Sequence, residues 1–153
     1  PRLHPFPRDL AICYNGLPIG GIGLIPGSDI ERRNAEVGYW LGEAYWGKAI
    51  MTEALRLFVD WAFRFPLPSQ YSPDGAAAAV GKAVLPRQML HRLFATVFAL
   101  NTASQRVLTN AGFALEGRLR QVYEKNGQLF DGVVMSLLRT EWEEQAKQQQ
   151  QGQ

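Results

Sequence analysis

The feature that most constrains the fold of this 153-residue chain is a change in the period of its apolar residues. Residues 35–41 alternate, which predicts a strand with Val37, Tyr39 and Leu41 on one face. From about Lys48 to Phe63 the period becomes helical. The core-facing stripe predicted for this helix is Ile50, Ala54, Leu57, Phe58, Trp61 and Phe65. A strand that leads directly into a helix favours an α/β fold.

Two Asn-Gly pairs predict β-hairpins near the two ends of the chain. Both positions of a tight hairpin turn favour positive φ, and Asn15-Gly16 and Asn126-Gly127 supply residues that tolerate it. The strands that they join are expected at 10–14, 17–26, 114–123 and 129–138. Glycines at 20, 21 and 23 in the second of these strands indicate a bulge or a close approach of another backbone.

The middle of the chain predicts a second strand and helix. A β-branched and aromatic run indicates a buried strand over 92–99. Asn101 or Thr102 then caps a short helix that ends near Ala111, and Gly112 follows where glycine favours a helix end. The order is therefore β-β-β-α-β-α-β-β, which predicts a mixed α/β sheet with a hairpin at each end.

One domain is expected over residues 1–142, because the length suits a single core. Within it, residues 66–88 are expected to form an inserted loop, since Pro66 to Pro86 holds four prolines and a run of alanines. The glutamine-rich tail at 143–153 is expected to be frayed or disordered.

Composition argues against several classes of protein. The net charge is +2 and the charges are interspersed, so nucleic-acid binding is not expected. No apolar run approaches the roughly 20 residues that cross a bilayer, and no His/Cys cluster has metal-ligand spacing. The single cysteine, Cys13, favours a reducing compartment, which predicts a cytoplasmic location and leaves the nucleus open.

The turn before the first helix has the makings of an anion site. The first backbone N–H groups of a helix lack internal partners and lie at the positive end of its dipole. Gly47 and Ala49 leave the backbone accessible, Lys48 adds positive charge, and Thr52 can offer a hydroxyl. The alternative is a glycine that merely allows the turn, since neither of the common glycine-rich phosphate-binding patterns is present.

Two blocks of sequence resemble the GNAT family of N-acetyltransferases, closest to the RimJ/RimL-like branch that acetylates N-termini of ribosomal proteins. The first block comprises 36–41, 45–49 and 52–54, and the second comprises 90–92, 101–104, 107–108, 112–113 and 116–117, with Asp131 and Trp142 beyond it. The family's turn pattern, Arg/Gln-x-x-Gly-x-Gly/Ala, is matched by Gly47 and Ala49, whereas Ala44 stands at its first position.

The resemblance implies acetyl-CoA as cofactor and transfer of its acetyl group to a primary amine by direct attack in a ternary complex. The amine belongs to a peptide or protein N-terminus or to a small molecule. A CoA-binding module without catalysis is the alternative. The pantetheine arm is expected between the strands at 37–41 and 92–99. The implied cofactor-binding residues are Tyr39, Trp40, Leu41, Trp46, Gly47, Lys48, Ala49, Thr52, Asn101 and Ser104. Asn101 can equally serve as a helix N-cap.

Three side chains are candidates for proton transfer. Ser104 is the first candidate acid, against an idle position in the first helical turn. Tyr123 is the second, against a strand aromatic that only packs. Glu36 is the candidate base and Glu116 its runner-up, although water can also take the proton.

The chain also departs from the family pattern. The family has a strand and two helices before the hairpin that opens this chain, where only about nine residues stand before Leu10. In the family those elements line one side of the acceptor site, so the sequence does not predict the acceptor site of this chain. Either a missing part of the chain or a partner chain, including a homodimer partner, would complete it. The insertion at 66–88 is expected at the end of the first helix opposite the anion site.

Overall fold

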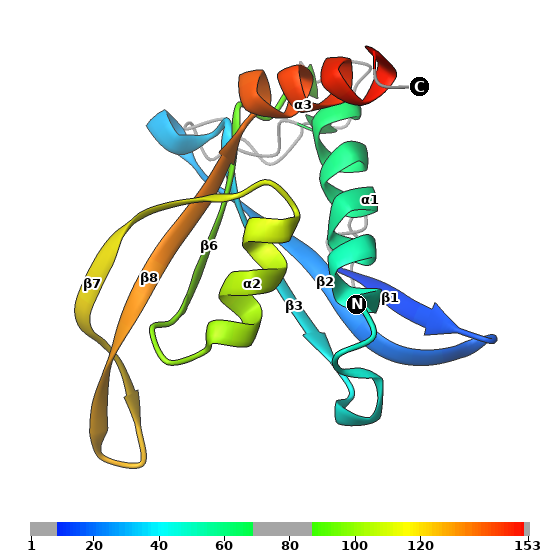
Figure 1. The fold of residues 1–153 in the computed structure, drawn as a ribbon. Helices are drawn as coiled ribbons and strands as arrows, with labels where there is room; N and C mark the ends of the chain where they lie inside the picture. The colour runs from blue at the N-terminus through cyan, green and yellow to red at the C-terminus, as the bar shows by residue number, and fades with distance from the viewer. Residues whose placement is uncertain (1–8, 69–86, 152–153) are drawn as a thin grey trace, which may run out of the picture.

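The protein is built on a six-stranded mixed sheet with two helices packed on one face (Figure 1). The structure, a computed structural model, describes residues 9–68 and 87–151. The strand order is β1-β2-β3-β6-β8-β7, in which β3 and β6 run parallel to each other and antiparallel to their other neighbours. The sheet strands are β1 Asp9–Tyr14, β2 Leu17–Pro26, β3 Asn34–Leu41, β6 Arg92–Phe98, β7 Ala114–Lys125 and β8 Gln128–Leu138.

The connections complete the predicted order. The helices are α1 Ile50–Arg64, α2 Thr102–Asn110 and α3 Arg139–Gln151, with single 3-10 turns η1 Asp29–Glu31 and η2 Glu43–Tyr45. Short strands β4 Leu67–Pro68 and β5 Arg87–Gln88 pair with each other. The predicted mixed α/β fold is confirmed, and α3 is an addition to it.

Both hairpin turns form as predicted. Asn15 and Gly16 have φ of 49° and 78°, and Asn126 and Gly127 have φ of 54° and 73°. The close approach expected in β2 is also found, because a Cβ on Gly20 would lie 2.5 Å from the carbonyl oxygen of Trp40. A bulge also lies in β2 beside Gly20, because the register shifts after Ile12 and leaves Ile19 without a partner in β1.

The core forms where α1 and α2 cover the sheet. Fully buried side chains come from all three parts: Leu55 and Phe63 of α1, Leu108 of α2, and Leu93 and Leu137 of the sheet. This hydrophobic core holds in place the strands that border the site described below, and it needs no bound ligand to do so.

The predicted stripe of α1 is wrong at two positions. Leu57 is 66% exposed and Phe65 is 54% exposed. Leu57 lies three or four residues from Glu53 and Asp60, so it shares the polar side of the helix. The face that packs on the sheet is Met51, Leu55, Phe58, Val59, Ala62 and Phe63.

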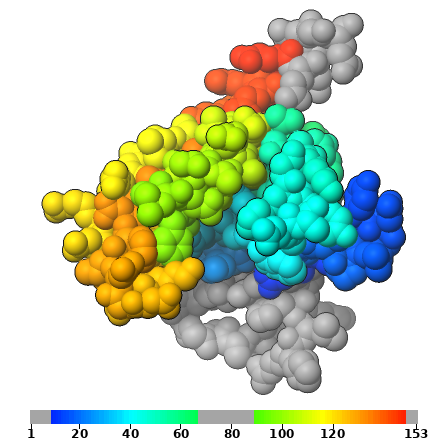
Figure 2. All heavy atoms as spheres, turned by 60° about the horizontal axis from the view of Figure 1, so that its bottom comes forward, coloured from blue at the N-terminus to red at the C-terminus, as the bar shows by residue number. Residues whose placement is uncertain are grey.

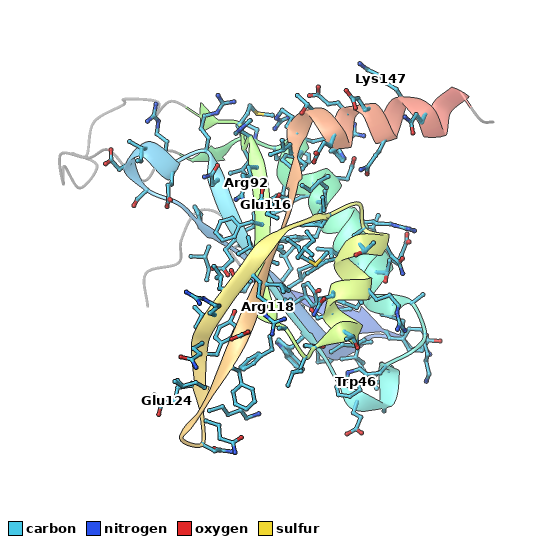
Figure 3. All side chains as sticks on the ribbon, turned by 60° about the vertical axis from the view of Figure 1, so that its left-hand side comes forward. Trp46, Arg92, Glu116, Arg118, Glu124 and Lys147 are labelled. Atoms are coloured by element: carbon cyan, nitrogen blue, oxygen red, sulfur yellow. The ribbon has the colours of Figure 1, made fainter. Side chains whose placement is uncertain are left out.

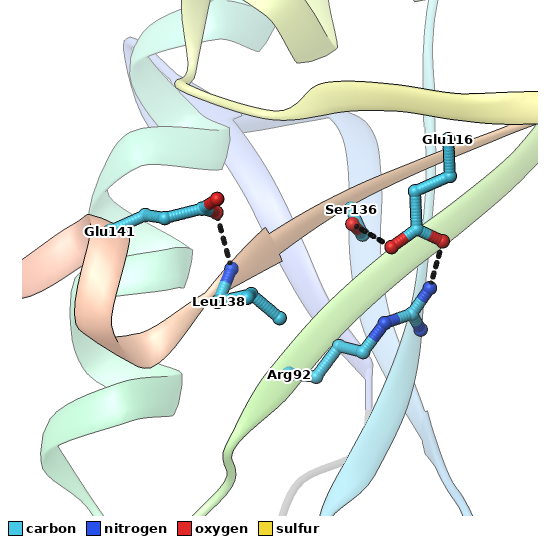
Figure 4. Close-up of polar contacts among 5 residues, drawn as sticks. All are labelled: Arg92, Glu116, Ser136, Leu138 and Glu141. Atoms are coloured by element: carbon cyan, nitrogen blue, oxygen red, sulfur yellow. Dashed lines mark hydrogen bonds and ion pairs between the residues drawn. The ribbon is translucent and has the colours of Figure 1, made fainter.

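The expectation of a disordered tail is wrong for residues 143–151, which belong to α3. Long-range contacts hold the start of this helix: the Trp142 ring lies 5.4 Å from that of Phe63, and the Arg139 guanidinium donates to the backbone oxygens of Leu90 and Phe63. The Glu141 carboxylate accepts the N–H of Leu138 at 2.9 Å (Figure 4). Gln, Glu, Lys and Ala then continue the helix because they are good helix formers.

The inserted segment leaves the fold at the C-terminal end of α1, away from Gly47. Its two ends are not loop, since Leu67 pairs with Gln88 and Pro68 with Arg87. The rest of the predicted loop lies outside the described residues. Within the described part of the chain, no helix combines the length and the apolar character that crossing a bilayer requires.

We expect Trp142→Ala to lower the free energy of unfolding by about 1–3 kcal/mol, because it removes a half-buried ring from Phe63. Urea unfolding followed by far-ultraviolet circular dichroism measures this. Leu57→Ala is the matched control on the exposed side of α1 and should cost less than about 0.5 kcal/mol. Equal losses in both variants would contradict the packing of α3.

Candidate functional site

The candidate site lies where β3 and β6 stop pairing. Their parallel ladder joins Asn34–Glu36 to Arg92–Phe94 and ends there. Beyond it, β3 stays paired with β2 as far as Leu41, and β6 stays paired with β8 as far as Phe98. The two strands therefore separate without losing their other neighbours, and the β6-facing edge of β3 is open to an extended ligand. Figure 2 shows a hollow between the turn before α1 and the α2 side, with the sheet at its bottom.

The turn that leads into α1 leaves the start of that helix without a side-chain cap. Gly47 and Ala49 both have left-handed backbones, with φ of 71° and 58°, and Ala49 is the N-cap residue. The helix therefore begins at Ile50, two residues later than predicted. A Cβ on Gly47 would have no atom within 4 Å. Uncapped N–H groups beside open space are what an anionic group needs.

Two predicted cofactor contacts shape this turn in the structure. The Trp46 indole N–H donates to the Leu41 carbonyl at 2.7 Å. The Lys48 ammonium donates to the Ala44 carbonyl at 3.0 Å and lies 5.6 Å from the centre of the Tyr45 ring. Both side chains thus close the turn on itself, and Figure 3 shows Trp46 at the end of the molecule where β3 leaves the sheet. Contact of either with a cofactor stays a prediction, as does that of Thr52 in the first turn of α1.

Asn101 caps α2, as one of its two predicted roles requires. Its Oδ1 accepts the backbone N–H of Ser104 at 3.0 Å. The other role, contact with the pantetheine arm, stays a prediction. The cap fixes the first turn of α2 beside the end of β6 and so fixes the position of the Ser104 hydroxyl.

Ser104 is not idle, because Tyr39 crosses from β3 to meet it. Tyr39 Oη and Ser104 Oγ lie 2.8 Å apart, and Tyr39 Oη also lies 3.3 Å from the Ser104 carbonyl oxygen. Burial raises the pKa of Tyr39, and the hydrogen bond to Ser104 offsets part of that rise. The sequence predicted backbone contacts for Tyr39 and did not predict this side-chain pair. The available signal was its alternation with Val37 onto the helix-covered face.

Glu36 and Tyr123 come together on the opposite face of the sheet. The negative charge of Glu36 contributes to a raised pKa of Tyr123, of which burial is the larger cause. The Tyr123 ring stacks on Phe98 with centroids 4.3 Å apart. A Cβ on Gly132 would lie 3.0 Å from this ring, so the glycine leaves room for it. Among the described residues, neither the Glu36 carboxylate nor the Tyr123 hydroxyl has a hydrogen-bond partner.

A bulge in β7, which the sequence did not predict, sets the position of Tyr123. The register shifts between Leu119 and Tyr123, and Gln121 has φ of 52°. Asp131 stabilises the bulge, since its two carboxylate oxygens accept the Gln121 N–H at 2.8 Å and the Arg118 Nε–H at 2.7 Å. These bonds, that of Gln121 first, lower the pKa of Asp131.

Glu116, the runner-up base, has a structural role. Its carboxylate accepts the Ser136 hydroxyl at 2.7 Å and pairs with Arg92 (Figure 4). The bond from Ser136, followed by Arg92, lowers the pKa of Glu116 against the opposing effect of burial. The cluster lies at the start of β6, where β3 and β6 are still paired, away from the gap between them. In the described residues no three metal-ligating side chains gather.

Comparison with known proteins identifies the family. A model of the GNAT acetyltransferase domain matches residues 6–114, and the chain belongs to this family. It is 36% identical over 126 residues to the probable N-acetyltransferase YjcK of Bacillus subtilis, covering 82% of this chain and 58% of the relative. It is 31% identical over 135 residues to the putative ribosomal N-acetyltransferase YdaF of the same organism, covering 88% and 61%.

A solved structure supports the same assignment. Mycobacterium smegmatis RimJ in complex with CoA-disulfide aligns with a TM-score of 0.62 at 27% identity, over 88% of this chain and 55% of that one. The resemblance to the GNAT family and its RimJ/RimL-like branch is thus confirmed. The chain spans about three fifths of the length of the two curated relatives.

The lowered pKa of Glu116 predicts a pH-dependent stability. The folded state holds this proton less tightly than the unfolded state, so the contribution is fully present above the ordinary glutamate pKa of about 4.3 and is lost as pH falls through the lowered value. Because Glu116 is 43% exposed and solvent screens its pairing with Arg92, Glu116→Gln should cost no more than about 1 kcal/mol at pH 7 and much less near pH 3. Urea unfolding between pH 3 and 7 measures the difference. Glu124→Gln, on the same strand and exposed, is the control, and a pH-independent loss in Glu116→Gln would contradict the prediction.

Proposed function

We propose that the chain transfers the acetyl group of acetyl-CoA to a primary amine. The observation that carries the proposal is the gap between β3 and β6, which has the Tyr39–Ser104 pair on one face and the Glu36–Tyr123 pair on the other. Two relatives with names that state N-acetyltransferase activity, and a similar structure that binds a CoA derivative, support it.

The residues present fit the chemistry of CoA. The free edge of β3 offers the backbone N–H and C=O groups of Tyr39 to an extended, amide-containing arm, whereas the carbonyl of Trp40 lies against Gly20 of β2. Leu41 lies on the same edge, with its carbonyl already bonded to Trp46. The uncapped start of α1, beside Gly47 and Ala49, suits a diphosphate. Trp46, Lys48 and Thr52 would border the diphosphate, and Asn101 would face the arm.

The proposed roles of the chain's own groups follow from their positions. Acetyl-CoA supplies the acetyl group and leaves as the CoA thiol. Glu36 accepts a proton from the acceptor ammonium, which makes the amine nucleophilic. Tyr123 borders the same face and helps to orient the acceptor. Ser104 donates its Oγ proton to the departing sulfur.

Direct attack of the amine fits the place of the only cysteine. Cys13 is exposed on β1, at the edge of the sheet and separated from β3 by β2. A thiol there is far from the gap, so we propose a ternary complex without an acyl-cysteine step. The name of YdaF, a putative ribosomal N-acetyltransferase, favours a ribosomal protein as the source of the acceptor amine, and a peptide-array acetylation screen would identify it.

Gly47→Val should abolish CoA binding, because a β-branched residue at a φ of 71° distorts the uncapped turn. Isothermal titration calorimetry with CoA measures it. Gly127→Val is a matched control, since Gly127 has a φ of 73° and equally open surroundings but lies in the β7–β8 hairpin. Unchanged affinity in Gly47→Val, or equal loss in both variants, would count against the proposed diphosphate site.

Glu36→Gln should lower kcat at least about 100-fold with little change in acetyl-CoA affinity, since it removes the proposed base and keeps the shape of the side chain. Steady-state assays with acetyl-CoA and a responsive peptide measure kcat, and Glu144→Gln on α3 is the control. Turnover by the unmodified protein separates an enzyme from a CoA-binding module. Full activity in Glu36→Gln would remove Glu36 as the base.

A further inference from the structure

Two hydroxyl groups, those of Tyr39 and Ser104, lie together at the gap, although protonation of the sulfur needs only one donor. Tyr39 reaches from β3 across to the first turn of α2, and its Oη lies 2.8 Å from Ser104 Oγ. A second contact, to the Ser104 carbonyl oxygen, is longer at 3.3 Å. A carbonyl oxygen only accepts, so Tyr39 donates in the longer contact, whereas either hydroxyl can donate in the shorter one. The arrangement in which Tyr39 donates to Ser104 Oγ leaves the Ser104 proton free to point into the gap.

Serine alone is poorly matched to the protonation of a thiolate. An aliphatic hydroxyl is a much weaker acid than a thiol, so a serine that gives up its proton unaided would be left as an unstable alkoxide. A tyrosine phenol has an ordinary pKa of about 10, close to that of a thiol at about 8.5. A phenol behind the serine is a far stronger acid than the serine hydroxyl and brings the acid strength of the donor nearer to that of the leaving group, even though burial raises the pKa of Tyr39 above its ordinary value.

We propose that Tyr39 is the proton source behind Ser104, which rests on the proposed acetyl transfer. As the thioester carbon–sulfur bond breaks, the sulfur takes the Ser104 Oγ proton, and Ser104 Oγ takes the Tyr39 Oη proton in the same motion. The negative charge that leaves the sulfur ends on the Tyr39 phenolate, which regains a proton from water after the products leave. Tyr39 acts through Ser104, so it is a positioning residue in this reaction.

The surroundings of Tyr39 suit this role. Its ring packs against the buried core, and burial keeps the phenol protonated at neutral pH. The Asn101 cap fixes Ser104 from the backbone side at 3.0 Å. Both partners of the pair are therefore held in place before any ligand binds, one by a strand and the other by a capped helix.

A spectroscopic experiment tests the relay without turnover. The protein is labelled with 13Cζ-tyrosine, and the Tyr39 signal is assigned with Tyr39→Phe. Addition of CoA should shift this signal, whereas desulfo-CoA, which lacks the sulfur, should shift it far less. Ser104→Ala should erase the difference between the two ligands. Equal shifts from both ligands would overturn the relay.

Turnover provides the second arm. Tyr39→Phe and Ser104→Ala should each lower kcat about 10- to 100-fold, and the double variant should be no slower than the slower single variant, because both remove one relay. Tyr14→Phe, an exposed tyrosine on β1, is the control. Losses that multiply, or a Tyr39→Phe enzyme within twofold of the unmodified protein, would overturn the relay alone. An unmodified protein that binds CoA but shows no turnover would instead overturn the proposed function.

Discussion

The site depends on one interaction that ends early, the parallel pairing of β3 with β6. It stops at Glu36 and Phe94, while β2 and β8 continue to hold the separating strands. A strand has two faces, so the residues that follow the last pair supply both sides of the gap. Tyr39 extends to the helix-covered face and Glu36 to the other. One short strand thus brings a candidate acid partner and a candidate base to opposite sides of the same opening.

The reactive groups around the gap are positioned by hydrogen bonds that take no part in the proposed reaction. Asn101 caps α2 and places Ser104, while Asp131 holds a bulge whose exit places Tyr123 above Gly132. Such supporting contacts set the geometry of reactive groups to fractions of an ångström. They also explain why Asp131 and Glu116 differ in role from Glu36, since their carboxylates are already occupied by hydrogen bonds.

The parts of this arrangement that could be predicted from sequence are local. Asn15-Gly16, Asn126-Gly127 and the Asn101 cap each act through their own backbone, and all three formed as predicted. The errors came from long-range packing: Leu57 faces solvent because of its charged neighbours, and Trp142 orders a tail by reaching Phe63. The two pairs at the gap were also beyond prediction, because a helix crossing and a bulge decide which side chains meet.

The pairing of β4 with β5 has a consequence for how this fold tolerates change. It brings residues 68 and 87 together beyond the end of α1, and the Arg139 bonds to Phe63 and Leu90 tie the flanking chain on both sides. With the two ends held, the free-energy cost of closing a flexible peptide between them rises only with the logarithm of the peptide's length, by about 0.6 kcal/mol per doubling. A flexible peptide can therefore be inserted between Pro68 and Arg87 at a small cost in free energy, while the gap between β3 and β6 stays intact.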